Sequence, residues 1–354
     1  MIASPNGSDP RGEAMAVSIY FATNRNPLKN DQVPNNFGTD FNPSGEIVFG
    51  RTTLQSVADE SELGNSNLAI DQLNAGDFLP ALQRAIVDGE DHLLITLHGF
   101  DYRFREAMMR AGHVGAWFAK GKPAVASTIV AFSWPSLGSL TVDAYKKDYQ
   151  SAGSSGGAFR RFLLALLPVL QAYRAAGGKR RVTLMAHSMG NHFLHAGLTA
   201  AVGSAPGQIA PDALAEVVDQ VLLIAGDEDA DALSSGVGLS SLVGVVREMV
   251  VYYNNQDIPL NTVSRATHGV GRLGIDGAPD KLSFVGKNVT FVNCSTVNPK
   301  LKNGERMDPQ WHQYYRLIPA VRDDICGVMR GDTKFPGRLF RAAKNFHVLR
   351  LRRP

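Results

Sequence analysis

Short apolar runs alternate along the chain with longer segments in which apolar residues recur at helical spacing. This alternation is typical of a parallel sheet whose strands are joined by crossing helices. Several runs are apolar on both faces, as strands covered by helices on both sides must be. We therefore predict an α/β fold, a three-layer α/β/α sandwich with a mostly parallel sheet. The predicted strands are residues 16–22, 92–97, 127–132, 181–186, 218–225, 248–254 and 288–294.

Two apolar stripes at helical spacing, in residues 104–118 and 159–170, predict helices that pack on this sheet. Residues 26–66 are rich in Asn, Pro, Gly and Ser, which predicts loops around one short strand near residues 46–51. We therefore expect three parts. They are an N-terminal tail and elaboration (1–66), a main α/β domain (67–333) and a basic C-terminal extension (334–354).

The composition places the chain among globular proteins, because 44% of its 354 residues are hydrophobic and 19% are charged. The longest apolar stretch, residues 162–170, is much shorter than the roughly 18 to 20 residues that a membrane-spanning helix needs, so we expect no membrane span. The first residues lack the charged-then-apolar pattern of a secretory signal. Two cysteines provide no disulfide framework, and we expect a cytoplasmic location.

The net charge is +3, and residues 334–354 hold seven basic residues and no acidic one. Only three aromatic residues accompany them, so the segment lacks the interleaved aromatic platform of a nucleic-acid-binding surface. We expect a solvated or packed extension and no nucleic-acid partner.

Residues 186–190, Ala-His-Ser-Met-Gly, begin at the last residue of the predicted strand 181–186 and indicate chemistry. A serine nucleophile at a strand-to-helix turn needs small residues two positions before and after it, because the two backbones pass very close there. Ala186 and Gly190 meet this need. Ser188 is therefore a candidate nucleophile, although an ordinary turn would use such a serine only as a helix N-cap.

A serine nucleophile also needs donors for the oxyanion that forms on the attacked carbonyl. The strand 92–97 runs into His-Gly-Phe-Asp, which predicts the backbone N–H of Phe100 as one donor. The second is the backbone N–H of Met189, directly after the nucleophile. His98 and His187 precede these turns, and we interpret them as packed rather than catalytic histidines.

The base should follow the nucleophile in the chain and lie after the last strand. Of the nine histidines, His192 and His195 fall on the helix directly after the serine. His268 precedes the last predicted strand, and His347 lies in the basic extension. His312 is therefore the best candidate.

Two loops at predicted strand ends offer the acid: the acidic run 227–231, and Asp257. Topology alone leaves both open. The run 227–231 does not continue as a calcium loop, because the glycine and the final glutamate of such a loop are missing. Residues 269–274 match GxGxxG but follow a polar loop, so we do not interpret them as a dinucleotide site.

Over about residues 16–330, the sequence resembles the bacterial esterase/lipase superfamily enzymes of the α/β-hydrolase fold that are grouped as domain of unknown function 900. The motifs that carry the resemblance are Tyr-Phe-Ala-Thr-Asn-Arg at 20–25, His-Gly-Phe-Asp at 98–101, Phe-Ser-Trp-Pro-Ser at 132–136 with Tyr145 and Asp148, Ala-His-Ser-Met-Gly at 186–190, Ala-Gly-Asp-Glu-Asp at 225–229, Tyr-Tyr-Asn-Asn-Gln-Asp at 252–257 with Arg-Leu-Gly at 272–274, and His-Gln-Tyr-Tyr-Arg at 312–316. The resemblance implies Ser188 as nucleophile, Asp257 as acid, His312 as base and hydrolysis of carboxylic esters.

We therefore expect a serine hydrolase of the carboxylesterase or lipase type, acting on a small-molecule ester through an acyl-enzyme, without a metal or other cofactor. Tyr102 and Trp134 follow strand ends and are expected to line the substrate pocket. Residues 232–246 predict either a mobile apolar lid or a buried helix. An acyltransferase or thioesterase with the same residues, and a non-catalytic binding protein, are the alternatives. The sequence predicts no oligomeric state.

Overall fold

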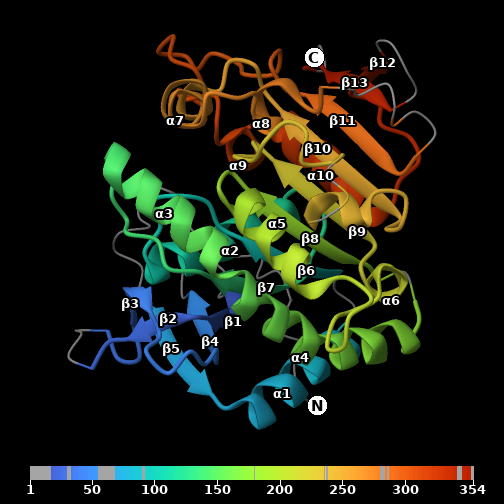
Figure 1. The fold of residues 1–354 in the computed structure, drawn as a ribbon. Coiled ribbons are helices and arrows are strands. Elements are labelled where there is room, and N and C mark those ends of the chain that lie inside the picture. The colour runs from blue at the N-terminus through green and yellow to red at the C-terminus, as the bar shows by residue number, and fades with distance from the viewer. Residues whose placement is uncertain are drawn as a thin grey trace.

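A central sheet runs through the molecule (Figure 1), and eleven strands belong to it within the residues that the computed structural model describes. Those residues are 17–29, 33–54, 68–89, 92–178, 180–234, 236, 238–279, 284, 287–340 and 345–351. Residues 1–16, which begin the predicted N-terminal part, lie outside them.

The strands follow one another across the sheet in a mixed order. In space they are β12 (Arg338–Phe340), β13 (Phe346–Leu349), β11 (Val289–Asn293), β10 (Glu248–Tyr253), β9 (Gln220–Ile224), β8 (Val182–His187), β6 (His92–Leu97), β7 (Ser127–Ser133), β1 (Val17–Thr23), β4 (Val48–Leu54) and β5 (Leu68–Leu73). All pairs from β13 to β1 are parallel, and antiparallel strands complete both edges. The carboxyl ends of the parallel strands therefore meet at one edge of the sheet, where an open α/β sheet binds its ligands.

Helices cover both faces of the sheet. One core contains residues of α1 (Ala75–Asp88), α4 (Gly156–Ala175) and α5 (Gly190–Ala201), and the other contains residues of α2 (Phe104–Ala119) and α10 (Pro319–Arg330). In β9, Val221 and Leu223 pack into the first core, while Leu222 and Ile224 pack into the second. Alternate residues of a strand point to opposite faces, so an apolar run is buried on both sides. The predicted α/β three-layer fold is confirmed.

Shorter elements connect these layers. They are α3 (Val142–Ser154), α6 (Pro211–Val217), the 3₁₀ helix η2 (Gly238–Leu242), the π-helical turn η3 (Leu260–Ser264), α7 (Arg265–His268), α8 (Leu273–Asp276) and α9 (Tyr314–Leu317). In Figure 1, α3, α7, α8 and α9 lie around the carboxyl-terminal edge of the sheet.

The N-terminal segment contains more strand than expected. Besides β4 and β5 in the main sheet, β2 (Arg25–Pro27) and β3 (Phe37–Phe41) form a separate two-stranded sheet. The short strand predicted near residues 46–51 is present as β4, but the prediction that the rest of residues 26–66 forms only loops was wrong. The strands are short and the turns between them are rich in Asn, Gly and Pro, so the segment as a whole has the composition of a loop. Only single buried residues such as Phe37 and Leu54 mark the strands.

The basic extension adds two strands to the sheet. β13 pairs in parallel with β11, and β12 pairs antiparallel with β13, so residues 288–294 are not the last strand as predicted. Arg338 is buried here and donates two 2.8 Å hydrogen bonds to the carboxylate of Asp324 on α10. This bidentate ion pair allows a basic segment to pack against the sheet.

Residues 232–246 form turns and the short, buried 3₁₀ helix η2 in their described part, so the predicted buried helix is present only over residues 238–242. Their buried apolar residues belong to the core that contains α5; they are Ala232, Leu233, Leu239, Leu242 and Val246. Gly238 has a φ of +59° and lies directly against His195 of α5, where a side chain would collide. The segment is therefore packed on α5, and its burial gives the lid interpretation no support.

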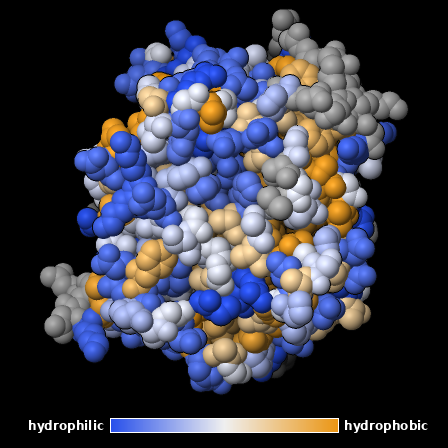
Figure 2. Space-filling model, viewed as in Figure 1, coloured by the Kyte–Doolittle hydropathy of each residue, from blue (hydrophilic) through white to orange (hydrophobic). Residues whose placement is uncertain are grey.

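The face in Figure 2 is mostly hydrophilic, and hydrophobic residues appear on it in limited patches. The most exposed large hydrophobic residues that the structure describes, Leu140 and Val142, stand at the start of α3. None of the described helices is both long and apolar enough to cross a bilayer.

Candidate active site

Ser188 occupies the sharp turn between β8 and α5. Its φ is +54°, a left-handed conformation that few residues other than glycine adopt. Two backbone hydrogen bonds hold it there: its N–H donates to the carbonyl of Ile224 at 2.9 Å, and its carbonyl accepts from the N–H of Asp227 at 3.0 Å. The turn is thus fixed to the end of the neighbouring strand β9.

Two glycines allow the close approach that this turn requires. A Cβ on Gly190 would lie 2.6 Å from the carbonyl oxygen of Leu97, and a Cβ on Gly99 would lie 2.9 Å from the Cβ of Ser188. Since such contacts are too short for carbon atoms, both positions need glycine. Ala186, two residues before the serine, is fully buried with its methyl group accommodated.

Phe100 and Met189, the two residues predicted as oxyanion donors, directly follow the two residues in contact, Gly99 and Ser188. Phe100 follows Gly99 on the loop after β6, and Met189 precedes the first residue of α5. Neither backbone N–H donates to a backbone acceptor in the loops and turns that the structure describes. Because Gly99 touches Ser188, the Phe100 and Met189 amides belong to the same small region of the molecule.

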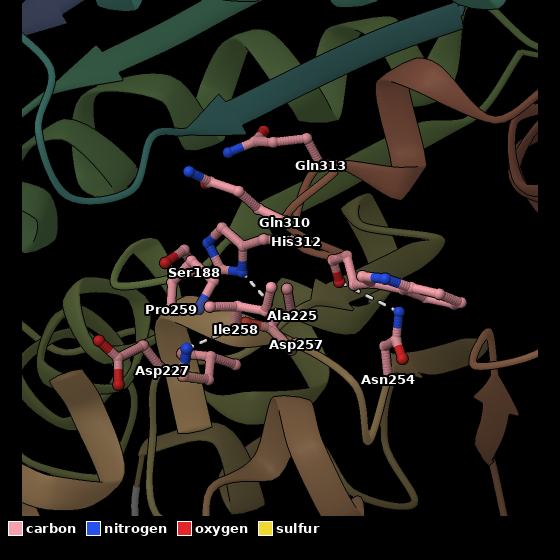
Figure 3. A network of polar contacts seen from close by, with 12 residues as sticks. Ser188, Ala225, Asp227, Asn254, Asp257, Ile258, Pro259, Gln310, His312 and Gln313 are labelled. Atoms are coloured by element: carbon pink, nitrogen blue, oxygen red, sulfur yellow. Dashed lines mark hydrogen bonds and ion pairs between the residues drawn. The ribbon is translucent and has the colours of Figure 1, made fainter. Parts of the chain in front are cut away.

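His312 and Asp257 form a buried pair beside Ser188. Nδ1 of His312 lies 2.6 Å from the Asp257 carboxylate, whose other oxygen accepts from the Leu260 N–H at 3.0 Å. In Figure 3, Ser188 lies on one side of the imidazole and Asp257 on the other. No hydrogen bond joins Ser188 to His312 among the described contacts, and such bonds are often long before substrate binds.

The loop that carries His312 is held to the end of β10 and to itself. The Ile258 N–H donates to the carbonyl of Gln310 at 3.0 Å, and the Asn254 side chain donates to the carbonyl of Trp311 at 3.0 Å. Asp308 accepts from the backbone N–H groups of Gln310 and Gln313. The strand after which Asp257 comes thus also positions His312.

The charges of this pair shift the pKa of the imidazole. Burial by itself lowers the pKa of His312, but the charge of Asp257 and the hydrogen bond to it outweigh burial and raise the pKa above its ordinary value. Because a carboxylate only accepts, Nδ1 carries the proton in the neutral ring and Nε2 has a free electron pair. That arrangement suits a general base.

A family described as alpha/beta hydrolase of unknown function (DUF900) matches residues 80–323. The chain belongs to this family. A comparison with curated proteins finds no match.

In this DUF900 α/β hydrolase, Asp227 is committed to other partners. One oxygen accepts from Arg272 at 2.8 Å and from Ser264, and the other accepts from the Tyr145 hydroxyl at 2.8 Å. Arg272, which is fully buried, also pairs with Asp229 at 2.5 Å. Of the two acids that topology left open, the structure therefore brings Asp257, the one implied by the resemblance, to His312 and places Asp227 in a separate ion-pair network.

Replacing Asp227 with asparagine is expected to affect folding far more than catalysis. Loss of one partner of a buried ion pair costs about 3 kcal/mol of unfolding free energy, because Arg272 keeps its charge. We expect that loss in urea denaturation, while kcat of the folded protein falls less than about tenfold. Asp229→Asn, at a half-exposed carboxylate, is the control and should cost less stability. A thousand-fold fall in kcat without a loss of stability would contradict this assignment.

The structure places the two predicted pocket residues, Tyr102 and Trp134, in different surroundings. Tyr102 lines a small, mostly apolar pocket between the end of β6 and α2, together with Val114 and Tyr315. Trp134 has no exposed surface, and its ring stacks on His98 with centroids 4.8 Å apart. The expectation that Trp134 lines a pocket was wrong, because the strand end that carries it is covered by packed rings.

His98 and His187 are both buried, as the sequence interpretation expected. Nε2 of His187 lies 3.1 Å from the carbonyl of His312 and so joins the loop that carries His312 to β8, the strand before Ser188. Sequence reasoning assigned no role to Arg25, which is fully buried and contacts the loop after β6. A basic residue two positions after the buried strand β1 was the available signal. Among the described residues, no cluster of three or more His, Cys, Asp or Glu has the arrangement of a metal site.

Proposed function

We propose that the protein is a serine hydrolase that cleaves carboxylic esters through an acyl-enzyme. One observation carries the proposal: a buried Asp257–His312 pair, 2.6 Å apart, lies beside a serine held at a strand-to-helix turn. The order of the three groups along the chain, serine, aspartate and histidine, is that of α/β hydrolases.

In the first half of the reaction, Ser188 Oγ attacks the acyl carbon while Nε2 of His312 takes its proton. Asp257 holds the imidazole through Nδ1 and stabilises the imidazolium that forms. The backbone N–H groups of Phe100 and Met189 stabilise the negative oxygen of the tetrahedral intermediate. His312 then gives the proton to the leaving alcohol, and the acyl group remains on the serine.

In the second half, water enters and His312 takes a proton from it as it attacks the acyl carbon. The intermediate collapses, the carboxylic acid leaves, and the proton returns to Ser188. The mostly apolar pocket lined by Tyr102 also touches Gly99, and it has room for a group no larger than about a methyl.

A fluorophosphonate probe and a panel of substrates test the proposal. The probe should label the wild-type protein once, at Ser188, as peptide mass spectrometry would report. Aryl and alkyl esters should be cleaved faster than acyl thioesters, and added alcohols should not become the main acyl acceptors. Neither labelling nor turnover would identify a binding protein, and transfer to alcohols in preference to water would identify an acyltransferase.

The activity should depend on pH through His312. Since the base must be neutral, kcat/KM is expected to rise with pH and to level off above the pKa of His312. The charge of Asp257 raises that pKa, so the midpoint should lie above the ordinary histidine value of about 6.5. Initial rates with an uncharged aryl ester, corrected for spontaneous hydrolysis, give the profile. A flat profile between about pH 5 and 9 would contradict a histidine base.

A further inference from the structure

The peptide between Gly99 and Phe100 is fixed by a side chain that the reaction itself does not use. Nδ1 of His98 lies 2.8 Å from the carbonyl oxygen of Gly99. A carbonyl oxygen only accepts, so Nδ1 carries the proton and donates. In a planar trans peptide the C=O and the N–H point in opposite directions. By holding the Gly99 carbonyl, His98 therefore also sets the direction of the Phe100 N–H.

This protonation of Nδ1 leaves Nε2 of His98 as an acceptor, and the donors that face it come from two other strands. Ser133 Oγ, at the end of β7, lies 3.3 Å away, and Arg25 Nη2 lies 3.5 Å away. Arg25 Nε in turn donates to Ser133 Oγ at 2.9 Å. A guanidinium can only donate, so the direction of the series is fixed: Arg25 to Ser133, Ser133 to His98, and His98 to the Gly99 carbonyl.

The surroundings keep His98 in this one form. Burial, helped by the charge of Arg25, lowers the pKa of His98 to about 3, so the ring stays neutral wherever the enzyme is folded and active. The stacked Trp134 donates from Nε1 to the carbonyl of His98 at 3.0 Å and fixes the residue from its backbone side.

Arg25 also holds the far end of the same loop. Its Nη2 donates to the carbonyl of Tyr102 at 2.7 Å, and its Nη1 donates to the carbonyls of Gly38 and Ser136. These acceptors are uncharged, and a fully buried guanidinium is costly unless its position is needed. Residues on both sides of Phe100 are thus tied to one arginine of the N-terminal segment.

We propose that His98, oriented by Arg25 through Ser133, is the positioning residue that aims the Phe100 N–H at the oxyanion. The proposal rests on the proposed serine hydrolase function and deepens it. A series of hydrogen bonds that starts at a cation polarises each following donor, so the Arg25 charge also strengthens the Phe100 N–H as a donor.

Two substitutions of His98 separate this role from packing. The amide of asparagine reaches the place of Nδ1 and can still donate to the Gly99 carbonyl, whereas the amide of glutamine reaches the place of Nε2. We expect His98→Gln to lower kcat about 10²-fold, the loss typical of one oxyanion donor, with little change in KM. His98→Asn should lower kcat by no more than about tenfold. Equal losses in the two variants, or a change in KM alone, would overturn the proposal.

Ser133→Ala removes the hydroxyl that joins Arg25 to His98 and is the smallest change that breaks this series. It also tests the positioning role if the His98 variants do not fold. We expect kcat to fall about tenfold with a cooperative thermal transition retained. A trifluoromethyl ketone inhibitor forms a tetrahedral adduct on the nucleophile whose oxygen occupies the oxyanion site. Its inhibition constant should rise by the same factor as kcat falls in every variant. A fall in kcat with unchanged inhibition would assign these residues to packing and overturn the proposal.

The wild-type protein keeps the two proposals apart. If it neither reacts with a fluorophosphonate nor cleaves any ester, both fail. If it does both while His98→Gln and Ser133→Ala keep the wild-type kcat, only the positioning role fails.

Discussion

Ser188→Ala is expected to lower kcat for ester hydrolysis by about 10⁶, which corresponds to about 8 kcal/mol of transition-state stabilisation. Without the hydroxyl no acyl-enzyme forms, and the remaining groups can only assist direct attack by water. The fold should persist, because the turn is held by backbone hydrogen bonds of residue 188 that alanine also makes. Steady-state rates at saturating aryl ester, with circular dichroism of the same sample, measure both quantities.

Ser241→Ala is the matched control for this substitution. Ser241 lies in η2 and donates to the carbonyl of Gly238, far along the chain from the turn. It should keep wild-type turnover and fluorophosphonate labelling, whereas Ser188→Ala should lose both. A folded Ser188→Ala protein that retains more than a few per cent of activity would identify another residue as the nucleophile.

Asp257→Asn is expected to lower kcat by about 10⁴. The imidazole loses the charge that stabilises imidazolium, and the asparagine amide no longer requires a proton on Nδ1. The side chain is fully buried, and its oxygen toward Leu260 can be retained by asparagine, so the loop should keep its place. The pKa of His312 should fall as well, because the Asp257 charge raises it, and the pH profile of the residual activity should move to lower pH.

Asp227→Asn is the appropriate comparison, since it makes the same chemical change at the end of the neighbouring strand. The expected results are opposite: large loss of kcat with modest loss of stability at Asp257, and the reverse at Asp227. If the two variants exchange these results, the acid comes from β9 and not from β10.

The features of this protein that depend on local sequence patterns could be predicted. Those that depend on contacts between distant segments could not. The central strands were predictable because burial on both faces makes them apolar throughout, as in residues 220–224 of β9. Topology alone could not choose between Asp227 and Asp257, since both follow strand ends, and only the family resemblance favoured Asp257. Their partners, Arg272 and His312, come from distant segments that only the folded chain brings close.

The terminal segments were only partly predictable, for a related reason. Seven basic residues in 334–354 left a solvated and a packed extension both open. The structure shows a packed one, in which Arg338 pairs with Asp324 on α10 and both are buried. Arg25 is similar, because its acceptors are backbone carbonyls and a hydroxyl that come from β3, β7 and two loops. No local sequence pattern indicates the partners of Arg338 or of Arg25.

The strands beyond β11 have a consequence for any shortened version of the protein. The family match ends at residue 323, before β13 begins. β13 pairs with the outer side of β11, and β11 pairs on its other side with β10, the strand before Asp257. A chain cut after α10 would leave the N–H and C=O groups of β11 without neighbours along an apolar strand. Such an edge is a template for a strand of another molecule, so the cut protein should self-associate through β11. In the structure β11 is paired, and the three-residue β12 stands at that end of the sheet instead, where its short length makes it a poor template.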